Sequence, residues 1–191
     1  MDYQVYSLAE LSSYAPDTSL LPADEQRVAA QRGEQYARIR SLLRQELQRR
    51  TGIPAQEITI TYNQHGKPEC NAQPFNLSHS GDCLCMAFHH TAIGVDVERI
   101  RPRHFESLAA RFMAPEQLGG FLSRNCPPDE FYACWCAAEA LVKQAGDTMW
   151  NARQYPFVYH SGRIHCLFDG APAVILFTPM PGYQGAVAYH P

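Results

Sequence analysis

The sequence predicts an α+β fold of two similar halves packed about a pseudo-dyad. The order of helical stretches followed by strand-like segments occurs twice along the 191 residues. Hydrophobic residues make up 46% of the chain, which is enough to bury a substantial core. An acidic strand lies near the middle, where a ligand cleft between two halves is expected. The expected halves are residues 1–98 and 99–191.

In the first half, helical periodicity precedes a series of alternating segments. The stretch from 23 to 50 is expected as two helical pieces that break near Gly33, and Gly52 ends the second piece. The segment Asn63–Pro68 has the composition of a turn. The strands expected in this half are Gln4–Ser7, Ile58–Tyr62, Phe75–His79, Leu84–Phe88 and Ile93–Glu98.

In the second half, prolines separate three helical stretches from a strand-rich tail. Helices are expected over His104–Phe112, over Pro115–Leu122 and from about Asp129 to Ala145, with Asp129 as the cap of the third. Ser161-Gly162 and Pro181-Gly182 supply turns in the tail. The strands expected there are Tyr155–His160, Ile164–Phe168, Val174–Thr178 and Ala186–Tyr189.

Composition excludes several functional classes. A net charge of −3 and an isoelectric point near 6.2 argue against a general nucleic-acid binder. No apolar run approaches the ~20 residues of a membrane span, and the N-terminus has no basic segment typical of a signal peptide. Seven cysteines without a disulfide-framework spacing indicate free thiols. We therefore expect a cytoplasmic protein.

Two acidic patterns point to a common site. In the middle strand, valines alternate with Asp96 and Glu98, so both carboxylates leave the same face. In a later helix, Trp135, Glu139 and Lys143 are spaced i, i+4 and i+8 and share a stripe. If the strand meets this helix, three carboxylates converge. Carboxylate oxygens without His or Cys suit Mg²⁺, and such a site typically receives a pyrophosphate.

Together these motifs resemble the 4′-phosphopantetheinyl transferases of the long, surfactin-synthetase-activator (Sfp) type. The resemblance extends roughly from residue 40 to residue 146. Its motifs are Gly66-Lys67-Pro68, Phe75 to Ser80, Ile93 to Glu98 and Trp135 to Lys143. It implies a pseudo-dimeric fold with the active site between the halves. It also implies transfer of the phosphopantetheine arm of coenzyme A to a Ser of an acyl or peptidyl carrier protein, with release of adenosine 3′,5′-bisphosphate.

The resemblance also implies a role for each matching acid and for Lys143. Asp96, Glu98 and Glu139 match the Mg²⁺ ligands of the family. Glu139 matches a residue that acts as a metal ligand, as the general base, or as both. Lys143 matches the group that stabilises or protonates the leaving bisphosphate. Trp135 is expected to anchor the helix in the core. The internal pseudo-dyad favours a monomer.

Five further residues match coenzyme A contacts. Ser78 and His79 correspond to such contacts, with His79 near the 3′-phosphate. Lys67 and Pro68 match the loop beside the adenine, and Arg40 matches a phosphate-binding arginine. A further phosphate contact is expected upstream, and the sequence does not choose between the arginines at positions 27 and 32.

One departure from the family pattern stands at Ala138, where the family usually has Lys. The missing ammonium is expected to weaken binding of coenzyme A, since a hydrogen bond to a charged group contributes ~1.5–3 kcal/mol. This departure motivates an alternative, a degenerate coenzyme A or carrier-protein binding module without turnover. An unrelated Mg²⁺ phosphohydrolase is a third hypothesis. The sequence does not identify the carrier protein.

Overall fold

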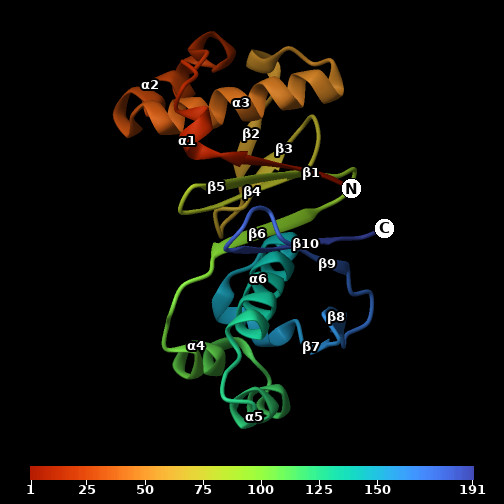
Figure 1. The fold of residues 1–191 in the computed structure, drawn as a ribbon. Helices are drawn as coiled ribbons and strands as arrows, with labels where there is room; N and C mark the ends of the chain where they lie inside the picture. Colours follow the sequence, from red (N-terminus) through yellow and green to blue (C-terminus); the bar gives the residue numbers. More distant parts are fainter.

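Two antiparallel three-stranded sheets lie at the centre of the computed structural model, which describes residues 1–191, and helices cover their outer sides (Figure 1). The first sheet has the order β1-β5-β4 and consists of Asp2–Ser7, Cys83–Phe88 and Phe75–Ser80. The second has the order β6-β10-β9 and consists of Ile93–Arg99, Tyr183–Tyr189 and Ala173–Phe177. The protein is therefore a mixed α/β protein, as predicted.

Each sheet has its own set of helices and one small hairpin. On the first sheet these are α1 (Leu8–Leu11), α2 (Ala23–Arg32), α3 (Glu34–Thr51) and the hairpin β2 (Ile60–Tyr62)–β3 (Pro68–Cys70). On the second they are α4 (Phe105–Phe112), α5 (Pro115–Ser123), α6 (Pro128–Ala145) and the hairpin β7 (Phe157–His160)–β8 (Arg163–Cys166). Three 3₁₀ turns lie at Thr18–Leu20, Ala55–Glu57 and Met149–Gln154.

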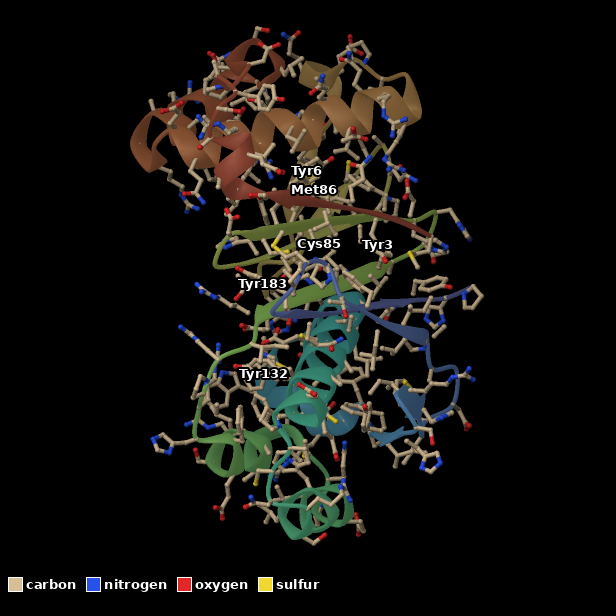
Figure 2. The ribbon with its side chains drawn as sticks, viewed as in Figure 1. Tyr3, Tyr6, Cys85, Met86, Tyr132 and Tyr183 are labelled. Carbon is tan, nitrogen blue, oxygen red and sulfur yellow. The ribbon has the colours of Figure 1, made fainter.

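The core is layered because β5 is buried on both of its faces. Its even-numbered residues, among them Met86, pack with Leu43 and Leu47 of α3. Its odd-numbered residues, among them Cys85, pack against β6 and β10 of the second sheet. Figure 2 shows Met86 and Cys85 on these opposite sides of the strand. Alternation along a strand sends successive side chains to opposite faces, so this apolar run joins two cores.

The third core lies between the second sheet and the helices below it, and α6 runs through its middle. Trp135 packs edge-on against Phe112 and stacks on Phe131, which confirms its predicted role as an anchor of the helix. The approach of α6 to β6 is so close that a Cβ on Gly94 would overlap the carbonyl of Ala140 and the amide of Gln144. Glycine at position 94 therefore permits the contact between strand and helix.

Most predicted elements are confirmed, and two local predictions are wrong. Gly33 separates α2 from α3, and Gly52 ends α3 with a left-handed φ of 74°. Asp129 is not the cap of α6, because the helix already begins at Pro128 and Asp129 lies in its first turn. Pro68 does not belong to the turn but begins β3. A proline is tolerated here because both strands of a two-stranded hairpin are edge strands, and each has one side that makes no ladder hydrogen bonds.

Two other sequence predictions concern the helices and the cysteines. None of the helices combines the length and the apolar character needed to cross a membrane. All seven cysteines are free, as predicted, and Cys83, Cys85, Cys134 and Cys136 are buried.

Candidate active site

Lys143 of α6 lies where three of the predicted site residues meet, namely Ser78, Asp96 and Glu139. Its Nζ donates to Oδ1 of Asp96 at 2.8 Å and to the carbonyl of Val95 at 3.3 Å, both in β6. It lies 3.4 Å from Oγ of Ser78 in β4 and 3.9 Å from Oε2 of Glu139, one turn earlier in α6. Burial lowers the pKa of Lys143, but the carboxylates of Asp96 and Glu139 outweigh this and raise it. The side chain is therefore an ammonium.

Asp96 is only 5% exposed, and its two carboxylate oxygens differ in their surroundings. Oδ1 accepts from Ser78 Oγ at 2.8 Å and from Lys143. Oδ2 is buried and has no hydrogen-bond partner. A buried carboxylate oxygen without a donor is costly, so Oδ2 is the atom at which a bound cation would be most favourable.

Glu98 lies two residues further along β6 and is held on one oxygen. Its Oε2 accepts from Oγ of Ser80 at 3.0 Å and from Nη2 of Arg103 at 3.2 Å. The guanidinium of Arg103 also lies over the ring of Tyr132, with Cζ 5.8 Å from the ring centroid. Neither Arg103 nor Ser80 was predicted from the sequence as a partner of Glu98. Serines two residues apart in β4 match the period of the acids in β6, and this was the available signal.

Glu139 is half-buried in α6 and carries a perturbed carboxyl group. Burial raises its pKa, and the nearby carboxylates of Asp96 and Glu98 raise it further, against the opposing charge of Lys143. A carboxylate of raised pKa is a stronger base than an ordinary Glu side chain, and a nearby cation would oppose that shift.

The three acids do not form a finished metal site in this arrangement. No group of three or more His, Cys, Asp or Glu side chains has the geometry of a metal centre. Lys143 instead provides the positive charge beside Asp96 and Glu139. The donor set still fits a hard cation, because it consists of carboxylate oxygens and leaves Oδ2 of Asp96 without a partner.

A cavity of about 340 Å³ opens beside these residues. Its walls include Lys67, Pro68, Glu139 and Lys143 of the predicted site, together with Asp147 and Met149. A second cavity, of about 320 Å³, shares Lys67 and Pro68 and extends toward Ile93 and the end of α6. The Lys67-Pro68 segment therefore lies between two adjacent hollows.

Lys67 is tied to α6 through a backbone contact. Its Nζ donates to the carbonyl of Gln144 at 2.6 Å, and Asn63 at the start of the same turn donates to the carbonyl of Gly146. Burial lowers the pKa of Lys67 to about 8, so the ammonium is poised to lose its proton just above neutral pH. A bound anion would reverse this shift.

The other predicted coenzyme A contacts do not line the cavity that contains Glu139 and Lys143. Arg40 is 5% exposed and, together with Arg44, forms an ion pair with Glu25. Ser78 is buried against Asp96, as described above. His79 follows it in β4 and is exposed.

Three more positions bear on the predicted phosphate contacts. The arginines at positions 27 and 32 of α2 are exposed. Ala138 is 2% exposed and belongs to the core around α6. A Lys at this position would have to extend its stem past core side chains before its ammonium reached a ligand.

Comparison with known proteins identifies the family. The model of the 4′-phosphopantetheinyl transferase superfamily matches residues 92–184, which include β6 and α6. The 4′-phosphopantetheinyl transferase ffp of Bacillus subtilis is 30% identical over 165 residues, which are 78% of this chain and 69% of that protein. This chain belongs to the 4′-phosphopantetheinyl transferase superfamily.

Two further relatives place it within that superfamily. The transferase Sfp of Bacillus subtilis strain 168 is 29% identical over 167 residues, covering 78% of this chain and 71% of that protein. The transferase AcpT of Escherichia coli O157:H7 is 33% identical over 134 residues, covering 64% and 67%. The resemblance to the Sfp type predicted from the motifs is confirmed.

Proposed function

We propose that this phosphopantetheinyl transferase family member moves the 4′-phosphopantetheine arm of coenzyme A onto a Ser of an apo acyl or peptidyl carrier protein. The products would be the holo-carrier and adenosine 3′,5′-bisphosphate. The observation that carries the proposal is the convergence of Asp96, Glu139 and Lys143 beside a cavity that also contains Lys67 and Pro68. The transferase names of the relatives support the same reaction class.

We further propose that the fold is a pseudo-dimer whose active site lies where its halves meet. The sheet orders β1-β5-β4 and β6-β10-β9 support this, because the two sheets have the same topology. In each, the last strand of the half (β5 or β10) lies between the first strand (β1 or β6) and the penultimate strand (β4 or β9). The predicted division at residue 98 stays a prediction. Since β6 pairs with β10, the sheet pairing favours a division in the turn between β5 and β6.

Asp96, Glu98 and Glu139 are the residues that would hold Mg²⁺. When bound there, the cation would neutralise charge on the pyrophosphate of coenzyme A. Among the chain's own groups, Lys143 supplies a fixed positive charge at the same place. Its ammonium would stabilise the negative charge that develops on the leaving 3′,5′-bisphosphate.

We assign Glu139 the role of general base. The Ser oxygen of the carrier attacks the β-phosphorus of coenzyme A, and the bond to the oxygen shared with the α-phosphate breaks. The Ser proton passes to Glu139, and the bisphosphate leaves with the bonding electrons. Positioned proton transfer of this kind contributes ~10²–10⁴-fold in rate, and the remaining acceleration comes from alignment and charge stabilisation.

Intact-mass analysis of an apo carrier protein tests the proposal. Incubation with this protein, coenzyme A and Mg²⁺ should add the mass of one phosphopantetheine group, and EDTA should prevent the addition. Binding of coenzyme A without mass gain on any carrier in a panel would support a binding module and overturn the transferase. Release of the bisphosphate from coenzyme A in the absence of a carrier would indicate a phosphohydrolase instead.

Lys67 gives the site an expected pH dependence. We propose that its ammonium contacts a phosphate of coenzyme A, which favours the protonated form. In the protein without coenzyme A, the pKa of Lys67 is lowered to about 8, so the affinity for coenzyme A should fall as the pH rises above that value. The expected loss is about tenfold between pH ~7 and pH ~9, measured as the Kd by calorimetry.

Lys67→Arg is the matched variant for this experiment. A guanidinium stays charged throughout this range, so the Kd of the variant should be nearly independent of pH. An equally steep dependence in wild type and variant would exclude Lys67 as its source.

A further inference from the structure

Strand β4 is joined to strand β6 by side chains rather than by a backbone ladder. The two strands belong to different sheets, yet three β4 side chains accept hydrogen bonds from β6 amides. The pairs are Asn76 Oδ1 with Val95 N at 2.8 Å, Ser78 Oγ with Val97 N at 3.3 Å and Ser80 Oγ with Arg99 N at 3.2 Å. The interval of two residues on both strands keeps the two in register.

The two serines make a second contact that Asn76 does not make. Ser78 Oγ donates to Oδ1 of Asp96 at 2.8 Å, and Ser80 Oγ donates to Oε2 of Glu98 at 3.0 Å. In each case the serine bonds the carboxylate of one residue and the amide of the next. A hydroxyl has one proton to donate and lone pairs to accept, so both contacts are compatible.

This arrangement restrains two like charges that project from the same face of β6. Each serine hydroxyl holds one oxygen of its carboxylate. For Asp96, the held oxygen is Oδ1, which leaves the buried Oδ2 without a partner. For Glu98, both hydrogen bonds end on Oε2. The serines, together with Lys143 on Asp96 and Arg103 on Glu98, therefore hold one oxygen of each carboxylate.

We propose that Ser78 and Ser80 are positioning residues that orient Asp96 and Glu98 toward a divalent cation across the junction of the two sheets. This inference rests on the proposed function for the identity of the cation site. Ser80 provides the cleaner test, because Ser78 also lies 3.4 Å from Nζ of Lys143. Ser80 is half-buried. Its replacement by Ala would leave the backbone amide of Arg99 without a partner, and water can bind this amide because Arg99 is exposed.

The experiment compares Ser80→Ala with Ser80→Thr. Threonine keeps the hydroxyl and is favourable in a strand, so it separates the hydrogen bond from the fold. The Kd for Mn²⁺ in the presence of coenzyme A is measured by the paramagnetic resonance of the free ion. Removal of a group that orients a metal ligand typically weakens affinity 10–100-fold. We expect about tenfold weaker binding in Ser80→Ala and a Kd within about twofold of wild type in Ser80→Thr.

Two results would overturn the serine inference. One is a Ser80→Ala variant that binds Mn²⁺ as tightly as wild type. The other is an equal weakening in the alanine and threonine variants, with thermal unfolding temperatures lowered in both, which would indicate a purely structural residue. As a second readout, transfer by Ser80→Ala should recover at saturating Mg²⁺, because the defect lies in affinity rather than in the chemical step.

Failure of the proposed function gives a different pattern. A wild-type protein that binds Mn²⁺ but modifies no carrier would remove the transferase, while the comparison of Mn²⁺ affinities would still decide the role of Ser80. A wild-type protein that modifies the carrier but whose Ser80→Ala variant keeps full Mn²⁺ affinity would remove only the role of Ser80. A wild-type protein that binds no Mn²⁺ would overturn the role of Ser80, while the intact-mass assay with Mg²⁺ would still decide the transferase.

Discussion

Glu139→Gln is expected to lower the rate of carrier modification by about 10²–10⁴-fold while the protein stays folded. The amide has nearly the same shape as the carboxylate but does not accept the Ser proton. It also removes one of the three predicted cation ligands. The rate is measured by intact mass at saturating coenzyme A, and a rate near that of wild type would contradict the proposed role of Glu139.

The same variant is expected to be more stable than wild type near neutral pH. Burial raises the pKa of Glu139 in the folded state, so ionisation of this side chain favours the unfolded chain. The gain in the free energy of unfolding should be present at pH ~7. It should vanish as the pH falls below the ordinary pKa of Glu, ~4.3, where both states carry a protonated carboxyl. The attraction of Lys143, whose Nζ lies 3.9 Å from Oε2 of Glu139, opposes part of this gain, but the net shift of the Glu139 pKa is still upward.

Glu116→Gln provides the matched control for both effects. Glu116 is an exposed residue in the first turn of α5 and lies outside the cavity. Its replacement should leave the transfer rate unchanged. The replacement should change the free energy of unfolding by no more than ~0.3–1 kcal/mol, which is the stabilisation that an acidic side chain gives near a helix N-terminus. A stability gain in both variants would show that the effect does not arise from the burial of Glu139.

Gly94→Ala is expected to produce the largest loss of stability among single methyl additions to this protein. The new Cβ would overlap backbone atoms of Ala140 and Gln144, which have no rotamer by which to move away. Overpacking of a core typically costs ~1–3 kcal/mol, and the cost here should lie at or above the top of that range because backbone must shift. Separation of β6 from α6 should also move Asp96 away from Lys143 and lower the transfer rate.

The control for Gly94 is Gly119→Ala in α5. A Cβ at this exposed helical position meets nothing within 4 Å. Alanine has the higher helix propensity, so this variant should be more stable by ~0.5–1 kcal/mol. Denaturant unfolding of the two variants checks the contrast. If Gly94→Ala were as stable as wild type, the close contact between β6 and α6 would be wrong.

Periodicity was sufficient to predict most elements of this fold. Alternating valines and acids predicted β6, and the spacing of Trp135, Glu139 and Lys143 predicted one stripe of α6. These signals are local, since each depends on residues within one strand or a few helical turns. The hairpin strand at Pro68 was missed because proline and glycine favour turns, and pairing with β2 overrides that preference.

Partners of the charged residues were much less predictable. The phosphate contact of Arg40 stays a prediction, and its ion pair with Glu25, fifteen residues earlier in the chain, was not predicted. The contact of Ser78 with coenzyme A also stays a prediction, and its hydrogen bond to Asp96 was not predicted. Both partners depend on how one element packs on another, and no spacing within one element encodes that distance.

The amino-acid sequence by itself determined the order of the elements, the resemblance to the family and the small set of acids and bases on which the proposed chemistry depends. The order of the elements follows from residue type and short-range spacing, and the family follows from the resemblance of its motifs. Only the tertiary structure decided that Lys143 reaches Asp96, that Ser80 holds Glu98 and that Oδ2 of Asp96 is left without a partner. These contacts arise where β4, β6 and α6 meet, and their geometry is set by the packing of the two sheets and by the close approach that Gly94 allows.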